Sequence, residues 1–274
     1  MPSSMSARIM GIVNVTPDSF SDGGEFLDPE RAIAHGLELA REGADVLDVG
    51  GESTRPGAQA VRAEEELHRV GPVVEALAAG AVPVSIDTSK VAVAEAALAA
   101  GAEMVNDVTA LRAEPDLAAL CAERDCEVVL MHMLGDPRTM QEDPTYDDVV
   151  DDVKAFLAER IEFAVSTGIE EERIWIDPGI GFGKTVEHNL ELHRRLGELA
   201  DLGHPIAFGS SRKSFIGKLT GAEVDRRLGG TIASNVIAYA NGARMLRVHD
   251  VAPMRQALTV ADAILDPSVS WSAP

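Results

Sequence analysis

The sequence has few cysteines and few basic residues, and each shortage excludes a class of protein. Its two cysteines, Cys121 and Cys126, are spaced C-x4-C, which matches neither a zinc knuckle nor a redox C-x-x-C pair, so we expect reduced thiols in the core. Only 24 basic residues stand against 45 acidic ones, giving a net charge of −21. This balance argues against binding nucleic acid or an anionic membrane through a broad basic surface, and an anionic ligand would need local positive groups.

The sequence also lacks long hydrophobic runs and linkers. No uninterrupted apolar stretch approaches the roughly 18 residues that span a bilayer, and the opening MPSSMSA has no charged and apolar targeting pattern. We therefore expect a soluble, cytoplasmic protein. Without a Pro/Ser-rich linker or low-complexity tract, residues 1–274 are expected to form a single domain with its core at about 8–265. The scarcity of lysine, five of the 24 basic residues, fits either salt adaptation or a GC-rich genome.

Short β-branched runs alternate along the chain with longer stretches whose apolar residues recur at helical spacing. The predicted strands are 8–15, 45–50, 82–87, 103–108, 127–132, 174–179, 205–210 and 243–249. The predicted helices lie near 29–43, 61–79, 90–100, 114–124, 147–168, 186–200, 226–241 and 253–264. Eight such units favour a single (β/α)8 TIM barrel over an open doubly wound sheet, which more often has about five or six strands.

Nearly every predicted strand is apolar until its last positions and then ends in a polar side chain. These residues are Asn14, Asp48, Asp87, Asn106, Asp107, His132, Asp177, Ser210, Arg247 and His249. A single one could simply cap the following helix. Because all strand C-termini of a parallel barrel share one face, where barrel enzymes keep their active sites, the whole set predicts an active site at that face.

The segment IDPGIGFGKT (176–185) fails two familiar phosphate-binding patterns. A dinucleotide G-x-G-x-x-G beginning at Gly179 requires glycine in place of Lys184, and a Walker A motif requires glycine in place of Pro178. The segment is interpreted either as an ordinary turn or as a tight, glycine-rich turn whose backbone approaches a flat ligand closely.

Cations are concentrated near the predicted strand ends. The segments GGESTRPGA (50–58) and GSSRKSFIG (209–217) carry Arg55, Arg212 and Lys213, and Arg247 with His249 lies on the last strand. Each alone is typical of a surface ion pair, but together they predict an anion site. His132 could be either a site residue or a satisfied core histidine, whereas His35, His68, His188 and His193 are expected at solvated helix positions.

The polar segment NVTPDSFSDGG (14–24) follows the first predicted strand. It is too polar for core and too long for a minimal turn, so we interpret it as a lid with Gly and Pro hinges.

Taken in order, these segments resemble one family, the dihydropteroate synthases of the pterin-binding barrel superfamily. The resemblance covers about residues 8–263. It is carried by GIVNVTPDSFSDGG, GGESTRPGA, SIDTSK, VNDV, LMHM, DPGIGFGK, SRKSFIG and RVHDV. It implies a transferase that condenses 6-hydroxymethyl-7,8-dihydropterin diphosphate with 4-aminobenzoate to give 7,8-dihydropteroate and pyrophosphate. The family is usually homodimeric, and sulfonamides, which mimic aminobenzoate, are expected to inhibit it.

The resemblance also implies a role for each matching residue. The pterin would be bound by Asp87, Asn106, Met131, Asp177, Phe182 and Lys213. Asn14, Arg247 and His249 would hold the diphosphate, with Asn14 also a ligand of Mg²⁺. Thr54, Pro56 and Ser214 would form the aminobenzoate site. Asp87, Lys213, Phe20 and Arg55 are the residues assigned to catalysis.

The implied chemistry is a dissociative, SN1-like substitution. Pyrophosphate is a good leaving group once Mg²⁺ and cations neutralise it, and Asp87 would stabilise the cation left on the pterin methylene. Phe20, in the lid, would cover that methylene. Two alternatives remain: a methyltetrahydrofolate-binding methyltransferase of the same superfamily, which has no use for a diphosphate clamp, and a paralogue that binds ligand without synthase activity.

Overall fold

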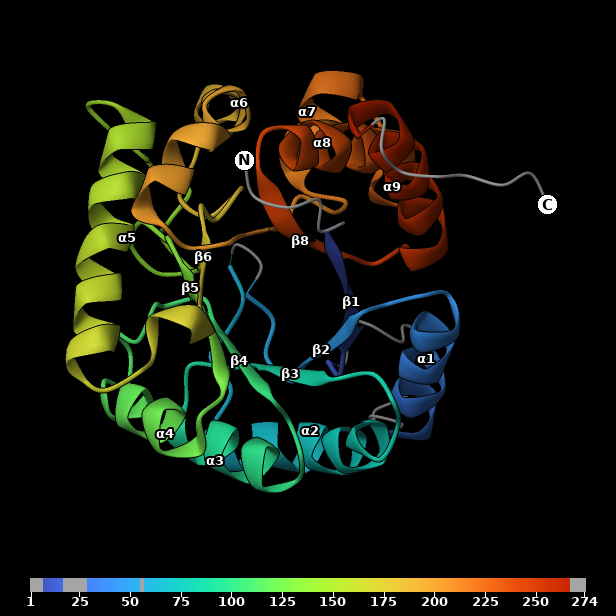
Figure 1. Cartoon of the computed structure of the whole chain (residues 1–274), viewed down its shortest axis with the longest axis vertical. Coiled ribbons are helices and arrows are strands. Elements are labelled where there is room, and N and C mark those ends of the chain that lie inside the picture. Colours follow the sequence, from blue (N-terminus) through green and yellow to red (C-terminus); the bar gives the residue numbers. More distant parts are fainter. Residues whose placement is uncertain (1–6, 17–28, 55–56, 267–274) are drawn as a thin grey trace.

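The computed structural model describes residues 7–16, 29–54 and 57–266. In this part of the chain eight parallel strands pair in sequence order, and the last pairs with the first to close a barrel. The helices surround this barrel on the outside (Figure 1). The predicted (β/α)8 TIM barrel is therefore confirmed.

The strands are β1 (Arg8–Asn14), β2 (Val46–Gly50), β3 (Val84–Asp87), β4 (Met104–Asp107), β5 (Glu127–Met131), β6 (Ile174–Asp177), β7 (Ile206–Phe208) and β8 (Ala243–Val248). The α-helices are α1 (Pro29–Arg41), α2 (Ala63–Ala78), α3 (Val91–Ala99), α4 (Asp116–Arg124), α5 (Val149–Ser166), α6 (Val186–Arg194), α7 (Ser214–Thr220), α8 (Leu228–Ala240) and α9 (Val251–Leu265). The described residues also form three 3-10 turns: η2 (Glu171–Arg173), η3 (Leu196–Leu202) and η4 (Val224–Arg226).

Strand residues alternate between the barrel interior and the surrounding helices. A buried cluster with a member on seven of the strands fills the barrel interior towards the amino ends of the strands: Met10, Val46, Met104, Val129, Trp175, Ala207 and Met245. The intervening residues, such as Ile9, Leu47 and Val105, pack in the larger cluster shared with the helices. Because both the barrel interior and the surrounding helices bury strand residues, the strands are apolar on both faces. The same two-residue period places the next interior layer, Asp48, Asp87, Asn106 and Asp177, at the carboxyl end of the barrel.

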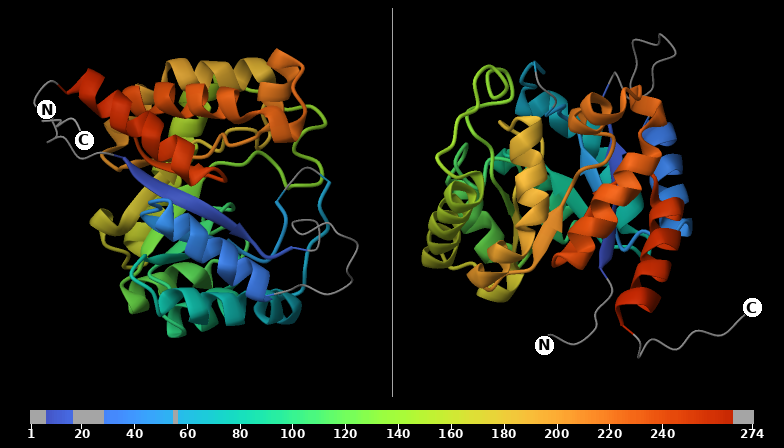
Figure 2. Two further views of the ribbon diagram at one scale, coloured as in Figure 1. Left: turned by 90° about the vertical axis from the view of Figure 1, so that its right-hand side faces the viewer. Right: turned by 90° about the horizontal axis from the view of Figure 1, so that it is seen from above.

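The loops that follow the strands lie together at one end of the barrel. In the left view of Figure 2 the segments after β2 and after β5 project from the same end. They are joined there by a hydrogen bond of 3.0 Å from the Gly57 amide to the Pro137 carbonyl. The sequence therefore places the polar strand ends around one shared rim, as barrel enzymes require.

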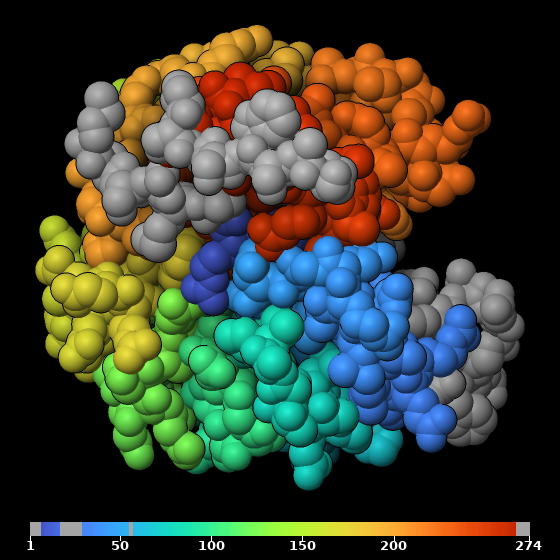
Figure 3. All heavy atoms as spheres, turned by 45° about the vertical axis from the view of Figure 1, so that its right-hand side comes forward, coloured from blue at the N-terminus to red at the C-terminus, as the bar shows by residue number. Residues whose placement is uncertain are grey.

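The outer helices cover the barrel and agree with most of the sequence-based expectations. Figure 3 shows α1 and α9 on the surface at either side of the start of β1. No described helix is both long and apolar enough to cross a membrane. Cys121 and Cys126 are both buried and free of a disulfide, as expected.

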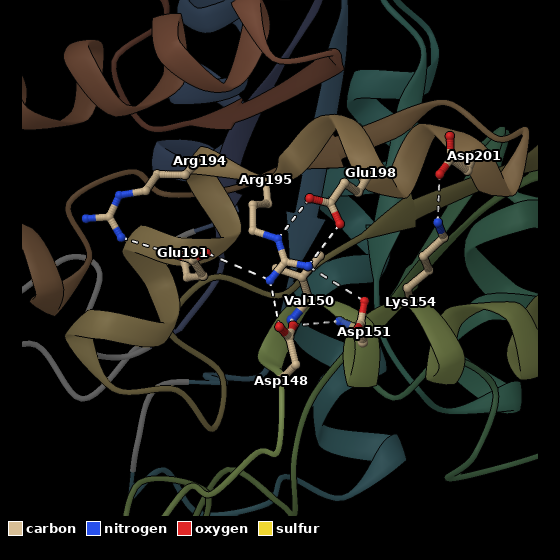
Figure 4. A network of polar contacts seen from close by, with 9 residues as sticks. All are labelled: Asp148, Val150, Asp151, Lys154, Glu191, Arg194, Arg195, Glu198 and Asp201. Atoms are coloured by element: carbon tan, nitrogen blue, oxygen red, sulfur yellow. Dashed lines mark hydrogen bonds and ion pairs between the residues drawn. The ribbon is translucent and has the colours of Figure 1, made fainter.

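Two features of the helical layer differ from the sequence-based prediction. The segment after β7, predicted only as a polar strand end, forms the short helix α7, because Phe215 and Ile216 bury their side chains against the core. The predicted helix 186–200 ends at Arg194 and continues as η3. Arg195, at that junction, contacts Asp148 at 2.7 Å and Glu198 at 2.8 Å, which fastens η3 to the start of α5 (Figure 4).

Candidate active site

A half-buried arginine and two buried carboxylates form the centre of the rim. Arg247, on β8, donates through Nε to Asp48 Oδ2 at 2.6 Å and through Nη2 to Asp87 Oδ2 at 2.7 Å. Asn106 Nδ2 donates to the same oxygen of Asp48 at 3.0 Å. The guanidinium fork thus joins β8 to β2 and β3, and it fixes both carboxylates at the open end of the barrel.

Burial and charge oppose each other at this centre. Burial raises the pKa of Asp87 to about 7, although the Arg247 guanidinium acts to lower it. Burial alone would lower the pKa of Arg247, but the Asp48 and Asp87 carboxylates raise it above its ordinary value. Arg247 therefore stays charged, whereas Asp87 exchanges its proton near neutral pH.

A second charged pair lies across the rim. Asp177 ends β6 and accepts a hydrogen bond of 2.6 Å from the Gly179 amide. Burial raises the pKa of Asp177, and the ammonium group of Lys213 lowers it in part. Burial lowers the pKa of Lys213 to about 8, against the opposing effect of Asp177. Lys213 is held in place because it donates to the Ile180 carbonyl and lies 4.5 Å from the centre of the Phe182 ring.

The glycine-rich turn after β6 approaches its neighbours too closely for any side chain. Gly179, Gly181 and Gly183 all have positive φ angles, between +63° and +80°. A Cβ atom on Gly179 would lie 1.9 Å from the carbonyl oxygen of His132. The tight turn predicted from IDPGIGFGKT is confirmed, and it brings the backbone of this segment directly against the end of β5.

Gly179→Ala is expected to destabilise the protein far more than Gly203→Ala. Both positions require a positive φ, but an added Cβ at Gly203 meets nothing within 4 Å. We expect a cost of about 1 kcal/mol at Gly203 from the left-handed backbone alone. At Gly179 the collision adds to it, for about 3 kcal/mol or more. Urea unfolding of the two variants measures the difference, and equal losses would show that the contact with His132 is relieved without cost.

Sulfur and aromatic side chains line the rim between β5 and β6. Met131, Met133 and Met140 form a small buried cluster, against which Val108 and Phe182 pack. Met131 is the last residue of β5, and its Cα pairs in register with that of Asp177. An apolar surface therefore lies directly beside the Asp177 carboxylate, as a flat heterocycle with a polar edge would require.

His132 is a buried core residue, which settles one of the two interpretations left open. Its Nδ1 lies 2.8 Å from Lys184 Nζ, and its ring packs edge-on against Phe156 at 4.9 Å between centroids. Burial, together with Lys184, lowers the pKa of His132 to about 2, so the ring is neutral. Lys184 also donates to the Phe182 carbonyl at 3.0 Å, and this pair holds the glycine-rich turn in place.

The predicted diphosphate and aminobenzoate residues are spread around the same rim. Asn14 is the half-buried last residue of β1, and His249 follows β8 with Nδ1 2.9 Å from Ser211 Oγ. Thr54 lines a pocket of about 260 Å³ that also includes Asp87. Ser214 is the exposed first residue of α7. Phe20, Arg55 and Pro56 lie outside the described residues.

Sequence reasoning missed several interactions of the site. Arg212, counted among the rim cations, donates to Asp250 at 2.5 and 3.0 Å. His193, expected at a solvated position, is buried; its Nε2 lies 2.6 Å from Ser234 Oγ, which donates to Ser210 at 2.7 Å. That prediction was wrong because a polar helix sequence does not show which helix side chains point at the loop after β7. Asp48 was noted only as a polar strand end and was given no role; its position two residues after the inward-facing Val46 is the signal that could have identified it as a site residue.

Comparison with known proteins agrees with this geometry. The family model described as "Pterin binding enzyme" matches residues 10–249. A dihydropteroate synthase of Synechocystis sp. is 46% identical over 258 residues, which cover 93% of this chain and 89% of the relative.

Solved structures give the same result at the level of the fold. A Xanthomonas albilineans dihydropteroate synthase with 4-aminobenzoic acid superposes with a TM-score of 0.90 at 53% identity, covering 96% of this chain and 94% of that one. A Yersinia pestis dihydropteroate synthase in a sulfonamide drug complex superposes with a TM-score of 0.90 at 44% identity, covering 94% of both chains. The chain therefore belongs to the dihydropteroate synthase family, a group of transferases among the pterin-binding enzymes.

Proposed function

We propose that the chain condenses 6-hydroxymethyl-7,8-dihydropterin diphosphate with 4-aminobenzoate to give 7,8-dihydropteroate and pyrophosphate by a dissociative substitution. The observation that carries this proposal is the Asp48, Arg247 and Asp87 centre, with Asp177 and Lys213 across the same rim. It combines acceptors for a pterin, a cation for a diphosphate and a carboxylate, Asp87, that can stabilise a developing positive charge. The names of the matching relatives support the same assignment.

Hydrogen-bond acceptors at the rim suit the pterin. The guanidine-like edge of a pterin presents several N–H groups, which carboxylates and amide oxygens satisfy. Asn106 directs its Nδ2 to Asp48, which leaves its Oδ1 as the acceptor for the ring. Asp177 adds a second acceptor and Lys213 a donor. Met131 and Phe182 supply the apolar surface on which the flat ring lies.

The diphosphate is proposed to lie between Asn14, Arg247 and His249. Arg247 keeps its charge because two carboxylates stabilise it, so it provides a local cation in a strongly acidic protein. The described residues contain no cluster of three or more His, Cys, Asp and Glu side chains that could hold a metal ion. Mg²⁺ fits this rim nonetheless, because it is usually held by one or two protein oxygens together with substrate phosphates, and Asn14 offers such an oxygen. When bound, Mg²⁺ would neutralise the departing pyrophosphate.

In the proposed reaction, the bond between the pterin methylene carbon and the bridging oxygen breaks first. Its electron pair leaves with pyrophosphate, and the dihydropterin carries the resulting cation. Asp87, once ionised, stabilises that cation across a short distance in a site of low dielectric. The nitrogen of 4-aminobenzoate then forms the new bond to the methylene and gives up one proton to water. No covalent bond to the enzyme is needed.

The second substrate is proposed to enter between Thr54, which follows β2, and Ser214, the first residue of α7, which follows β7. Sulfonamides would compete there because they mimic 4-aminobenzoate, and the Yersinia pestis relative is known in such a complex. We also propose that the protein is a homodimer, which sedimentation equilibrium of the full chain would test.

Product formation tests the proposed function. Purified protein with both substrates and Mg²⁺ is expected to release pyrophosphate and form dihydropteroate in equal amounts. Chelation of Mg²⁺ is expected to slow both by about 10²-fold, because the leaving group then carries its full charge. Pterin binding without pyrophosphate release would instead indicate a binding paralogue, and methyl transfer to a corrinoid would indicate the related methyltransferases.

A further inference from the structure

Lys90 joins three segments at the rim. It lies three residues after Asp87 and donates to Glu52, on the loop after β2, and to Glu66, on α2, the latter at 2.5 Å. The Glu66 side chain is completely buried, and that of Lys90 is 16% exposed. Burial acts to lower the pKa of Lys90, but the two carboxylates raise it above its ordinary value. The ammonium group is therefore charged and is fixed between its partners.

Glu52 joins the two ends of the loop that follows β2. We call this contact between Glu52 and Val61 the neck of the loop. One of its carboxylate oxygens accepts from Lys90, and the other accepts from the Val61 amide at 3.4 Å. The residue before it is equally fixed, because Arg69 Nη1 donates to the Gly51 carbonyl at 2.7 Å. The two ends of segment 52–61 are thus held together, and Lys90 anchors the neck to the turn that carries Asp87.

The described residues beyond this neck, among them Ser53, Thr54, Ala58 and Ala60, line one wall of the active-site pocket. Ser53 and Thr54 line the pocket together with Asp87 and Thr88, which belong to the Lys90 turn. At its far side the segment is tied to the loop after β5 through Gly57 and Pro137. A shift of the neck would therefore move Thr54 relative to Asp87, although it would leave Asp177 and Lys213 on the opposite side of the barrel in place.

The charges make Lys90 difficult to replace. It is one cation for two carboxylates, and Glu66 Oε1 finds no hydrogen-bond partner among the described residues. Without the ammonium group, Glu66 would be left as an uncompensated buried charge and Glu52 would be free to turn toward solvent.

We propose that Lys90 is a positioning residue for the second substrate: through Glu52 it holds the neck of segment 52–61, and thereby places Thr54 opposite Asp87. This inference rests on the proposed function, in which Thr54 contacts 4-aminobenzoate. It assigns Lys90 no contact with either substrate.

Steady-state kinetics of Lys90→Met tests this role. We expect the KM for 4-aminobenzoate to rise about tenfold, the loss that one charged hydrogen bond implies. The Kd for the pterin diphosphate should change less than about twofold, because Arg247 still holds Asp87 and the Ile180 carbonyl still holds Lys213. Lys90→Arg should restore most of the aminobenzoate KM, since a guanidinium also spans two carboxylates. The matched control is Lys154→Met, which removes an ion pair of 2.8 Å to Asp201 far from the rim and should leave both constants unchanged.

Glu52→Gln provides a second variant in case Lys90→Met does not fold. Glu52 is 24% exposed, so its replacement leaves Lys90 paired with Glu66 and the core intact. Like Lys90→Met, it should raise the KM for aminobenzoate. An unchanged aminobenzoate KM in both variants, or an equal loss of pterin and aminobenzoate affinity, would overturn the proposal.

Hydrogen exchange of the ligand-free protein separates this proposal from the proposed function. The amides of Gly57 and Val61 should exchange about tenfold faster in Lys90→Met than in wild type or Lys154→Met, because the neck opens more often. If the wild-type protein forms no dihydropteroate, the proposed function fails. Unchanged exchange at these two amides would independently refute the claim that Lys90 holds the neck closed.

Discussion

Asp87→Asn is expected to lower kcat/KM for the pterin diphosphate by about 10²–10³-fold, the loss typical when one stabilising group at the reacting centre is removed. The amide keeps the shape of the side chain and a hydrogen-bond acceptor, but it cannot offset a positive charge on the pterin methylene. Because Asp87 is nine-tenths buried and bound to Arg247, its effect on the cation is barely screened by water. Single-turnover rates with saturating substrate measure the loss in the chemical step.

The control for this variant is Asp201→Asn, whose carboxylate pairs with Lys154 on the outer surface and should leave the rate unchanged. A decrease of less than about tenfold in Asp87→Asn would show that the carboxylate charge is not what stabilises the transition state.

The same variant should change how stability depends on pH. In the folded protein the pKa of Asp87 is raised from 3.8 to about 7, so between these values the folded state binds more protons than the unfolded state. Its contribution to stability is therefore fully present below about pH 4 and is lost as pH rises through 7. The loss is on the order of 1 kcal/mol per pH unit, and Asp87→Asn should remove it. The free energies of unfolding of variant and wild type at pH 5 and pH 8 test this, and a parallel pH dependence would contradict it.

Arg247→Met is expected to have the second large effect, on both binding and stability. The variant leaves Asp48 and Asp87 buried without their cation, which should cost about 3–5 kcal/mol of unfolding free energy at pH 8. The cost should be smaller at pH 6, where Asp87 takes up a proton. Loss of the cation should also weaken binding of the pterin diphosphate about 10²-fold, and binding of the unphosphorylated pterin much less.

A surface arginine provides the comparison for this prediction. Arg173 makes a similar fork to Asp125, at 2.6 and 3.1 Å, but both side chains are well exposed. Arg173→Met should cost no more than about 1 kcal/mol. If the two variants lose similar stability, the carboxylates at the rim are better solvated than their burial indicates. Equal weakening of the two pterin ligands by Arg247→Met would argue against a diphosphate role.

The sequence was sufficient to predict the barrel and the rim, but not the pairing of side chains at the rim. The two-residue period of the strands and their polar last positions place Asp87, Asn106 and Asp177 at one end, because parallel strands share a direction. No sequence pattern shows that Arg247 binds Asp48, 199 residues away. That contact depends on closure of the barrel between β8 and β1 and on the rotamer of a long side chain, neither of which is a local property.

The buried charged side chains were the feature of the structure that the sequence predicted least well. Lys184 and Lys90 lie in polar, glycine- or serine-containing segments that are equally typical of solvated turns, yet each is enclosed by other elements. Their partners belong to other elements: His132 directly follows β5, and Glu66 lies on α2. The helix α7 was missed for a related reason, because its seven residues are too few to show a helical period.

The most direct test of this account compares single-turnover formation of dihydropteroate from the pterin diphosphate with CH2 or CD2 at the reacting methylene. With Mg²⁺ and 4-aminobenzoate present, we predict that both substrates give product and that the deuterated one reacts measurably more slowly, because the methylene becomes planar as pyrophosphate departs. Equal rates in the chemical step would contradict the dissociative reaction and favour direct displacement by the amine. Absence of dihydropteroate with either substrate would contradict the proposed function itself.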